Sequence, residues 1–331
     1  METKILNGDC IEMMKTLPEQ SVNCCVTSPP YFGLRDYGHE GQIGLEETPE
    51  AFVQKLVEVF REVKRVLRDD GTLWLNLGDS YAAQRGGTHQ PAETLAGGKG
   101  GKTEDGQQVN RDRHDGYNPT RFASRIGLKH KDMIGIPWRV AFALQADGWY
   151  LRQDIIWHKP NPMPESVQDR CTKAHEYIFL LSKSPKYYFD NKVIMEPAQY
   201  GEQHAKKATS WGTNRKHPNK DNVADYAFAG DNHTTSKMED GSYGRNKRSV
   251  WTVTTKPYAG AHFATFPPDL IRPCILAGCP KGGVVLDPFG GSGTTAAVAT
   301  EESRSAILCE LNPDYIPLIN ERLSKIQPNL L

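Results

Sequence analysis

In the first third of the chain, short apolar runs alternate with segments in which apolar residues recur every three or four positions. Three short apolar runs, at residues 5–6, 22–26 and 72–79, predict buried strands, and the first of them ends at the turn sequence NGD. Apolar residues recur every three or four positions over 48–67, which predicts an amphipathic helix that starts at the sequence TPE and stops at RDDG. A shorter helix is predicted over 10–17, because a proline follows it.

The alternation of strands and helices continues in the rest of the chain. A helix is predicted over 136–148 and a strand over 149–160, followed by a pair of strands, EYIFLLSKS and KYYFD, joined by a Ser-Pro turn. Another helix is predicted from Pro267 to about Leu276. The segment 282–320 then has the order strand, glycine-rich turn, helix, strand, acidic residue and helix. This order is typical of an α/β fold.

Two long polar segments interrupt the pattern. Residues 84–131 are rich in Gly, Arg, Lys, Gln and Asn and are too long for an ordinary connection, which predicts a mobile loop over a site or along a charged ligand. Residues 196–250 are also polar, and their basic clusters are consistent either with a nucleic-acid contact or with a solvated surface balanced by nearby acids. The clusters and the aromatic residues between them are Lys206, Lys207, Arg215, Lys216, Arg245, Lys247 and Arg248, with Trp211, Tyr226, Phe228 and Tyr243.

The composition excludes a strong overall electrostatic field. Lys plus Arg and Asp plus Glu both number 40 among 331 residues, so binding to a polyanion requires local basic patches. The seven cysteines are scattered without CxxC spacing, which predicts reduced, mostly buried thiols and no metal site. The sequence METKILNGDC has no apolar signal region, and no segment has the length of a membrane span, so we expect a soluble, cytoplasmic protein.

The sequence TSPPY, residues 27–31, follows the predicted strand 22–26 directly. A turn needs at most one proline, whereas two consecutive prolines fix both φ angles and remove both backbone donors. The backbone carbonyls of this segment are therefore left as acceptors, next to the Ser28 hydroxyl and the Tyr31 ring. The sequence predicts a rigid hydrogen-bond acceptor site covered by an aromatic side chain.

The sequence VVLDPFGGSGTT predicts a strand that runs into a glycine-rich turn and then a helix from Ser292 onward. The turn lacks the lysine of a phosphate-binding P-loop and does not have the GxGxxG spacing of a nicotinamide fold. It suits a nucleoside-like cofactor without a pyrophosphate, since Glu310 ends the next strand, where a carboxylate can accept both ribose hydroxyls. A glycine turn that only packs a helix against a strand is the alternative, and Asp287 and Glu310 on either side of the turn favour the cofactor site.

Together these motifs resemble those of the amino-methylating DNA methyltransferases, which use S-adenosylmethionine, and the resemblance covers nearly the whole chain. The catalytic motif of that family is [DNS]-P-P-[YFW], and its cofactor motif is the DPF-x-GSGTT run. The sequence AHFATFP resembles the family's loop beside the methionine end of the cofactor, and NGDC the strand end near the adenine. On this resemblance the catalytic residues are Ser28, Pro29, Pro30 and Tyr31, and the cofactor residues are Asp9, Phe266, Asp287, Pro288, Phe289, Gly290, Gly291, Ser292, Gly293, Thr294 and Glu310.

The catalytic motif precedes the cofactor motif, which is similar to the β group of the family. The resemblance implies a circularly permuted, Rossmann-like α/β sheet, with a catalytic half over 1–189, an inserted target recognition domain over 190–255 and a cofactor half over 256–331. It also implies double-stranded DNA and a cognate restriction endonuclease as partners, in a bacterium, archaeon or phage, whereas monomer or homodimer stays open. The expected DNA contacts are Arg111, Arg113, Arg121, Lys159, Arg245, Lys247 and Arg248.

The chemistry of the target agrees with the TSPPY motif. An exocyclic amino group of a base is a poor nucleophile, because its lone pair is conjugated into the ring. Acceptance of its N–H bonds by the Ser28 hydroxyl oxygen and the Pro29 carbonyl favours sp³ character and directs the lone pair at the methyl group. Tyr31 stacks on the base, which must leave the duplex. The prolines hold the acceptors in place in advance, and no covalent intermediate is required.

Three alternative functions differ in substrate or chemistry. Ser28 resembles the cytosine-N4 members, whereas the adenine-N6 members usually carry Asp or Asn, so we expect cytosine N4 and keep adenine N6 as the alternative. RNA and protein amino-methyltransferases place the glycine motif before the catalytic motif, and this chain has the reverse order. A catalytically silent nucleic-acid-binding module is disfavoured because Ser28, Tyr31, Asp287 and Glu310 are all present.

Three further residue groups allow both a functional and a structural interpretation. The sequence RPC, residues 272–274, resembles the Pro-Cys nucleophile of cytosine-C5 methyltransferases, but its position favours core packing. Asp79 ends a strand near the site, and a cap of a helix or turn is slightly favoured. His158 and Lys159 either contact phosphate or simply end a strand, and the sequence does not distinguish the two.

Overall fold

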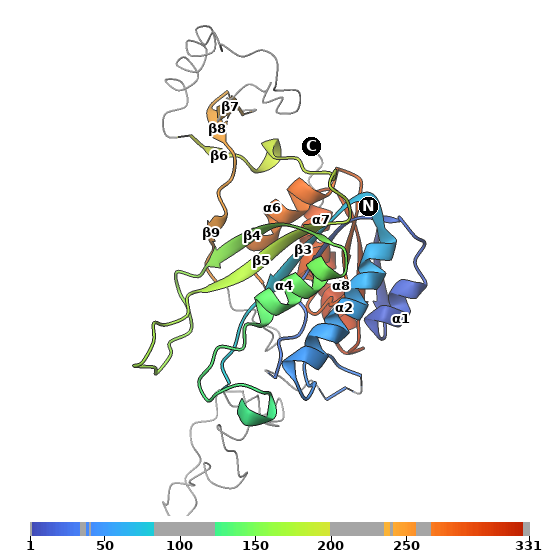
Figure 1. Ribbon diagram of the computed structural model, residues 1–331. Helices are drawn as coiled ribbons and strands as arrows, with labels where there is room; N and C mark the ends of the chain where they lie inside the picture. Colours follow the sequence, from blue (N-terminus) through green and yellow to red (C-terminus); the bar gives the residue numbers. More distant parts are fainter. Residues whose placement is uncertain are drawn as a thin grey trace, which may run out of the picture. The chain divides into compact units, whose positions relative to one another are not determined.

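The computed structural model describes most of the chain as two compact units. One unit comprises Met1–Tyr188 and Ser249–Leu331, and the other comprises Phe189–Arg248. Figure 1 shows both units, with the residues that are not described drawn in grey. The described residues are 2–33, 38–39, 41–82, 123–198, 235–238, 241–255 and 266–326.

An eight-stranded mixed sheet forms the centre of the first unit, in the order β1-β11-β10-β2-β3-β5-β4-β9. Neighbouring strands are parallel from β1 to β3, β5 is antiparallel to both β3 and β4, and β9 is parallel to β4. The C-terminal strands β10 and β11 thus lie between the N-terminal strands β1 and β2, which confirms the predicted permuted α/β fold. The strands are β1 Thr3–Asn7, β2 Val22–Thr27, β3 Leu67–Leu77, β4 Tyr150–His158, β5 His175–Ser182, β9 Val250–Thr252, β10 Val284–Asp287 and β11 Ser305–Glu310.

Helices cover both faces of this sheet (Figure 1). On one face lie α1 (Cys10–Lys15), α2 (Pro49–Val66) and α4 (Ile136–Ala146), which share a core with Leu73, Leu75 and Leu77 of β3. On the other face lies α6 (Pro268–Gly278), whose Gly278 packs against Trp74 and Thr72 of the same strand. Residues of opposite parity in β3 therefore meet different helix layers, as the two-residue period of a strand requires.

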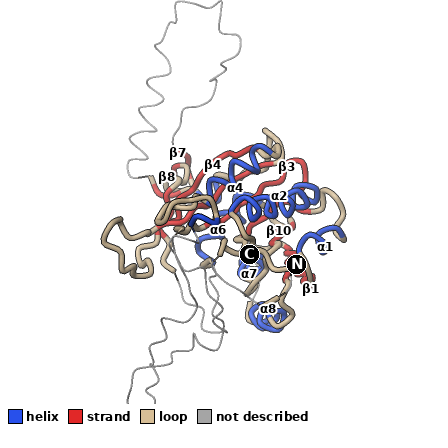
Figure 2. Tube along the Cα trace, turned by 60° about the horizontal axis from the view of Figure 1, so that its bottom comes forward, coloured by secondary structure: helices blue, strands red, loops and turns tan. Residues whose placement is uncertain are grey.

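The two helices of the C-terminal region complete the packing around the glycine-rich turn. Helix α7 spans Thr294–Glu301 and α8 spans Tyr315–Ser324. Figure 2 shows α8 beside α7, and the two helices are in contact. The α7 helix starts two residues later than the sequence predicts, at Thr294, because Gly293 takes a left-handed conformation with φ +75°.

The long helix α2 agrees with its prediction at both ends. The Thr48 hydroxyl caps it by accepting the Ala51 N–H at 3.2 Å, as the sequence TPE predicts. The predicted stop at RDDG is confirmed, because the helix ends at Val66, and the residues after it belong to β3. Leu67 is fully buried in β3, and an irregularity in the register with β2 accommodates the polar residues after it.

The predicted strand KYYFD is wrong. These residues, 186–190, have no regular secondary structure, and the Tyr188 N–H donates to Asp70 O at 2.8 Å. The reason is that β5 is already paired with β3 on one side and β4 on the other, so no free edge is left for a hairpin partner.

The second unit contains a small antiparallel sheet in the order β6-β8-β7. Its strands are β6 Glu196–Pro197, β7 Thr235–Lys237 and β8 Tyr243–Arg245, and a 3-10 turn, η2, spans Lys192–Ile194. The basic and aromatic residues between 199 and 234 lie outside the described residues, as do residues 84–122 of the predicted loop 84–131. Among the residues that the structure describes, no helix is long and apolar enough to cross a membrane.

Candidate active site

The two sequence motifs meet at one edge of the central sheet. Strands β2 and β10 are parallel neighbours, with Cys24 opposite Val285 and Cys25 opposite Leu286, so the segments that follow them emerge side by side. Both segments line one pocket. The predicted site residues that line it are Asp9, Ser28, Pro29, Pro30, Tyr31, Phe266, Asp287, Pro288, Phe289, Gly290, Gly291, Ser292, Thr294 and Glu310.

The glycine turn lies close to the strand and helix around it. The Gly290 N–H donates to Cys309 O at 2.8 Å, and a Cβ at Gly290 would lie 3.1 Å from Leu308 Cβ. A Cβ at Gly293 would lie only 2.9 Å from Ile319 Cγ2 of α8. Gly293 does not line the pocket, so the structure gives it a packing function at the start of α7. Close packing and ligand approach therefore both require glycine in this turn.

Glu310 lies at the end of β11 with both carboxylate oxygens already engaged. Oε2 accepts the Gly291 N–H at 2.7 Å and Oε1 accepts the Asn312 N–H at 2.8 Å. The side chain is buried, and this burial raises the pKa of Glu310 above its usual value. Because a carboxylate has about four acceptor positions, two remain for hydroxyl groups of a ligand in the pocket.

Asp287 joins the three segments that form the pocket. Its Oδ1 accepts the Thr27 hydroxyl at 2.6 Å and the Phe289 N–H at 3.0 Å, and its Oδ2 accepts the Thr295 hydroxyl at 2.6 Å. The residue is 2% exposed, and burial raises the pKa of this carboxyl to about 7. The carboxylate therefore fixes the end of β2 relative to β10 and α7, a role that the sequence alone does not reveal because Thr27 and Asp287 are far apart in the chain.

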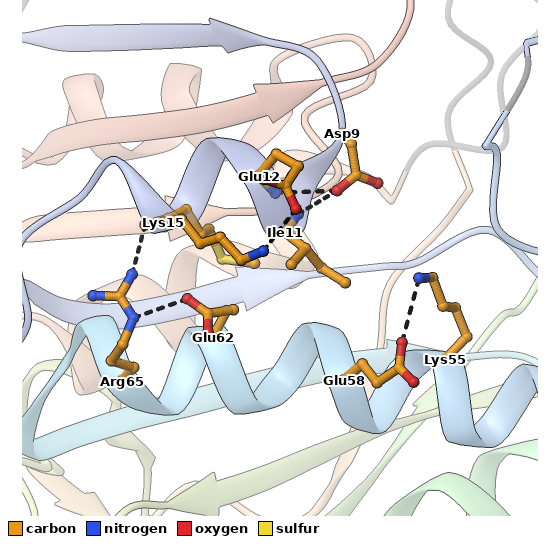
Figure 3. Close-up of polar contacts among 9 residues, drawn as sticks. Asp9, Ile11, Glu12, Lys15, Lys55, Glu58, Glu62 and Arg65 are labelled. Carbon is orange, nitrogen blue, oxygen red and sulfur yellow. Dashed lines mark hydrogen bonds and ion pairs between the residues drawn. The ribbon is translucent and has the colours of Figure 1, made fainter.

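Asp9 combines a structural bond with a position at the pocket. Its Oδ1 accepts the N–H groups of Ile11 and Glu12 at 3.0 and 3.1 Å, which caps the N-terminus of α1 (Figure 3). The cap holds the carboxylate at the turn between β1 and α1, where the adjacent Gly8 and Cys10 also line the pocket. A contact between Asp9 and a cofactor stays a prediction.

Several pocket residues have no signal in the sequence. His39, Gly41, Gln42 and Ile43 come from the connection between β2 and α2, and Tyr315 begins α8. From the same helix, the Arg322 guanidinium donates to the Ser292 carbonyl at 3.2 Å and to the Thr294 hydroxyl at 2.8 Å. Such contributions depend on how a connection or a helix folds back on the sheet, and no motif marks them.

Most of the expected DNA-contacting residues are either engaged within the protein or outside the described residues. Lys159 forms an ion pair with Glu176. Arg245 and Arg248 donate to Glu196 Oε1 at 3.0 and 2.5 Å. Arg111, Arg113 and Arg121 lie outside the described residues. A DNA contact for these residues and for Lys247 stays a prediction.

The structure decides two of the open interpretations in favour of a structural role. Asp79 Oδ1 accepts the N–H groups of Ser80, Gly135 and Ile136 at 2.9, 2.9 and 3.0 Å, which caps the start of α4. Cys274 is 1% exposed and packs in the core, as its position in the sequence RPC predicts.

The cysteines also agree with their predicted burial. Six of the seven are buried and Cys171 is exposed, and all are free thiols. Desolvation raises the pKa of Cys10 to about 12, which keeps this pocket-lining thiol protonated and unreactive. The described part of the chain has no group of His, Cys, Asp and Glu side chains that could hold a metal ion.

Comparison with known proteins identifies the family. The model of the DNA methylase family, which groups N6- and N4-methyltransferases, matches residues 22–321, so this chain belongs to that family and uses S-adenosylmethionine as its methyl donor. The chain is 45% identical to the type II methyltransferase M.XycI of Xanthomonas campestris pv. cyanopsidis over 99% of its length and 89% of that protein. It is also 45% identical to the type II methyltransferase M.SmaI of Serratia marcescens, over 97% of this chain and 90% of that protein.

Two solved structures share the fold at low sequence identity. The PvuII DNA methyltransferase, described as cytosine-N4-specific, superposes with a TM-score of 0.60 at 17% identity, over 100% of this chain and 89% of that one. A DNA modification methylase of Thermus thermophilus in complex with S-adenosyl-L-methionine superposes with a TM-score of 0.53 at 22% identity, over 98% and 95%. The resemblance to DNA methyltransferases inferred from the motifs is confirmed.

Proposed function

We propose that the protein transfers a methyl group from S-adenosylmethionine to the exocyclic amino group of a base flipped out of double-stranded DNA, and that this base is cytosine, methylated at N4. The observation that carries the proposal is the single pocket lined by both the TSPPY segment and the glycine turn. A methyl donor and an amino acceptor must share one enclosure for a direct transfer, and the adjacent strands β2 and β10 supply it.

The cofactor end fits a nucleoside with a charged sulfonium side chain. The glycine turn allows backbone approach, and Glu310 keeps acceptor positions for the two ribose hydroxyls. Phe266 and Phe289 add apolar surface to the lining. S-adenosylmethionine supplies an electrophilic methyl group when bound. The residues of this chain hold it by accepting its hydroxyl groups and by enclosing it.

At the other end, TSPPY provides the acceptors for the target amino group. The Ser28 hydroxyl oxygen and the Pro29 carbonyl accept its two N–H bonds and so direct the nitrogen lone pair at the methyl group. Because the two prolines fix the backbone, these acceptors need little reorganisation as charge develops on the nitrogen. Tyr31 stacks on the base and offsets part of the cost of removing it from the duplex.

Two observations support cytosine N4 over adenine N6. The first motif residue is Ser28, the residue type that resembles the cytosine-N4 members. The protein with the same fold and a TM-score of 0.60 is described as cytosine-N4-specific. The type II methyltransferases at 45% identity further support a role beside a cognate restriction endonuclease. Adenine N6 methylation is the second candidate.

We infer further that residues 190–255 read the DNA sequence and that the 84–131 segment holds the DNA backbone. The described residues of 189–248 form a compact unit separate from the catalytic sheet, which supports an independent recognition function. Arg, Lys, Asn and Gln side chains in this segment are the types that bond base edges. The glycine-rich, basic composition of 84–131 suits a segment that orders on phosphates.

Mass spectrometry of nucleosides tests the proposal. DNA from cells that express the protein is digested to nucleosides and compared with DNA from cells that express the Tyr31→Ala variant. We expect N4-methylcytosine only with the unaltered protein. N6-methyladenine would replace the base assignment, and incorporation of labelled methyl groups into RNA or protein but not DNA would refute the proposed function.

A further inference from the structure

The hydroxyl group of Tyr31 is held by a residue of β5, which lies two strands away from β2 in the sheet. Tyr31 Oη donates to Glu176 Oε2 at 2.7 Å, across 145 positions of the chain. Glu176 lies near the start of β5, where that strand pairs with the end of β4 and with β3 (Figure 1). A rigid sheet residue therefore fixes the outer end of the aromatic ring in the TSPPY motif.

Glu176 is itself held by two further side chains. Lys159, which follows β4, forms an ion pair with Oε1 of this carboxylate. Asn76 of β3 donates to Glu176 Oε2 at 3.3 Å and to the Tyr177 carbonyl at 3.0 Å. The side chains of Lys159 and Glu176 are only 18% and 14% exposed, so the pair is largely shielded from water. In such surroundings the loss of one partner leaves the other charge uncompensated, so the two side chains hold each other in place.

The face of the Tyr31 ring is constrained as well as its hydroxyl. Gly78 lies against the ring, and a Cβ at this position would be 2.6 Å from Tyr31 Cε2. Any other residue at position 78 would displace the ring, which explains a glycine directly after β3. The ring is therefore located by backbone at its face and by Glu176 at its hydroxyl.

Glu176, Lys159 and Asn76 do not line the pocket, whereas Tyr31 does. These three side chains thus have no direct route to the cofactor or the target base, and any effect they have on the reaction must pass through Tyr31. We propose that Glu176, held by Lys159, is a positioning residue that keeps the Tyr31 ring in its stacking orientation before DNA binds. This inference rests on the proposed function of Tyr31, and it also assigns Lys159 a role other than a phosphate contact.

Fixing the Tyr31 ring before DNA binds lowers the entropic cost of stacking the base on it. A ring that is already fixed loses little conformational freedom when the base stacks on it, whereas a ring with a free hydroxyl must be ordered by the base itself. Tyr31→Phe removes only the hydroxyl, and Glu176→Gln removes the charge while it keeps the size of the side chain. Both variants act on the same bond: Tyr31→Phe removes its donor, and Glu176→Gln weakens its acceptor because an amide oxygen carries no charge and forms no ion pair with Lys159. Their effects should therefore not multiply.

The experiment measures single-turnover methylation of a duplex that carries a site mapped by sequencing the DNA of expressing cells. We expect Tyr31→Phe and Glu176→Gln each to lower the rate about tenfold, and the double variant to be no slower than the slower single variant. A mismatch opposite the target base lowers the cost of flipping and should accelerate both variants by a larger factor than the unaltered protein.

The matched control is Glu62→Gln, which removes a similarly shielded ion pair with Arg65 on the outer helix α2 (Figure 3). This variant should keep the unaltered rate, and all variants should bind S-adenosylmethionine normally in calorimetry. Unaltered activity of Glu176→Gln would overturn the inference, and so would a double variant whose loss is the product of the single losses.

Three further outcomes distinguish a failure of this inference from a failure of the function on which it rests. If Glu176→Gln does not fold, the Tyr31→Phe variant alone tests the inference. The inference is then overturned if the mismatch accelerates methylation by Tyr31→Phe no more than methylation by the unaltered protein. If Tyr31→Ala is inactive while both conservative variants are normal, the proposed function stands and the positioning role fails. If the unaltered protein methylates no amino group in DNA, the proposed function itself fails.

Discussion

The proposed cofactor end and the proposed base end of the pocket are built from different kinds of interaction. At the cofactor end, backbone N–H groups of Gly291 and Asn312 bind the Glu310 carboxylate, and parallel strands supply the segments. At the base end, side chains from the antiparallel strands hold Tyr31 through Glu176. The cofactor end is therefore fixed by main-chain geometry, whereas the base end depends on a few replaceable side chains. This difference lets the acceptor site vary without disturbing the donor site.

The largest expected effect is a loss of stability when Asp287, which connects the two ends of the pocket, is replaced. Asp287→Ala leaves the Thr27 and Thr295 hydroxyls and the Phe289 N–H without their acceptor, and should lower the free energy of unfolding by about 3–5 kcal/mol. Chemical denaturation measures this loss. The mechanism would be wrong if Asp287→Ala were as stable as a Thr300→Ala control on the same helix.

The same carboxyl predicts a pH dependence. Burial raises the pKa of folded Asp287 to about 7, against about 3.9 for an unfolded aspartate, so between these values the folded state binds more protons than the unfolded state. Stability should therefore fall as pH rises from about 4 through 7. Asp287→Asn removes this titration and should flatten that part of the profile, which denaturation at several pH values measures.

The next effect concerns the cofactor end alone. Glu310→Ala should weaken S-adenosylmethionine binding by about 1.5–3 kcal/mol, because two buried ribose hydroxyls lose a charged acceptor. Calorimetry measures the affinity, and Glu321→Ala on the exposed face of α8 is the control. A folded variant with unaltered affinity would remove Glu310 from the cofactor site.

A comparable or smaller loss of binding energy is expected at the base end. There the methylation activity should fall while the cofactor affinity stays normal. Tyr31→Ala should remove stacking worth about 1–3 kcal/mol, and with it most of the methylation activity, while cofactor affinity stays normal. If cofactor affinity fell together with activity, the two ends would not be independent. Normal methylation by this variant would place the base site elsewhere.

The smallest expected effects lie outside the pocket. Neutralising Arg111, Arg113 and Arg121 should weaken binding to all DNA sequences and reduce the slope of its salt dependence, whereas replacing Arg245, Lys247 or Arg248 should relax or abolish site choice. Filter binding at several salt concentrations and sequencing of methylated DNA measure the two effects. If a chimera with residues 190–255 of a relative of different specificity keeps the original site, recognition does not lie in this segment.

The sequence by itself determined the local elements and the chemistry of the two motifs. Short apolar runs located the central strands, which are buried on both faces, and a period of about three and a half residues located the helices, which are buried on one face. The prolines and glycines of TSPPY and GGSG fixed special backbone geometry, which single residues encode directly. The sequence RDDG also marked the end of α2 correctly, because these residues lie at the register shift between β2 and β3 and pair with no residue of β2.

Only the tertiary structure decided which distant residues meet. Thr27 reaches Asp287 and Tyr31 reaches Glu176 because β10 and β5 take particular places in the sheet, and strand order is not written in any local pattern. The same pairing left KYYFD without an edge, although its composition suits a strand. The physical reason is that local sequence selects backbone conformation over a few residues, whereas hydrogen-bond partners across the sheet depend on the packing of the whole chain.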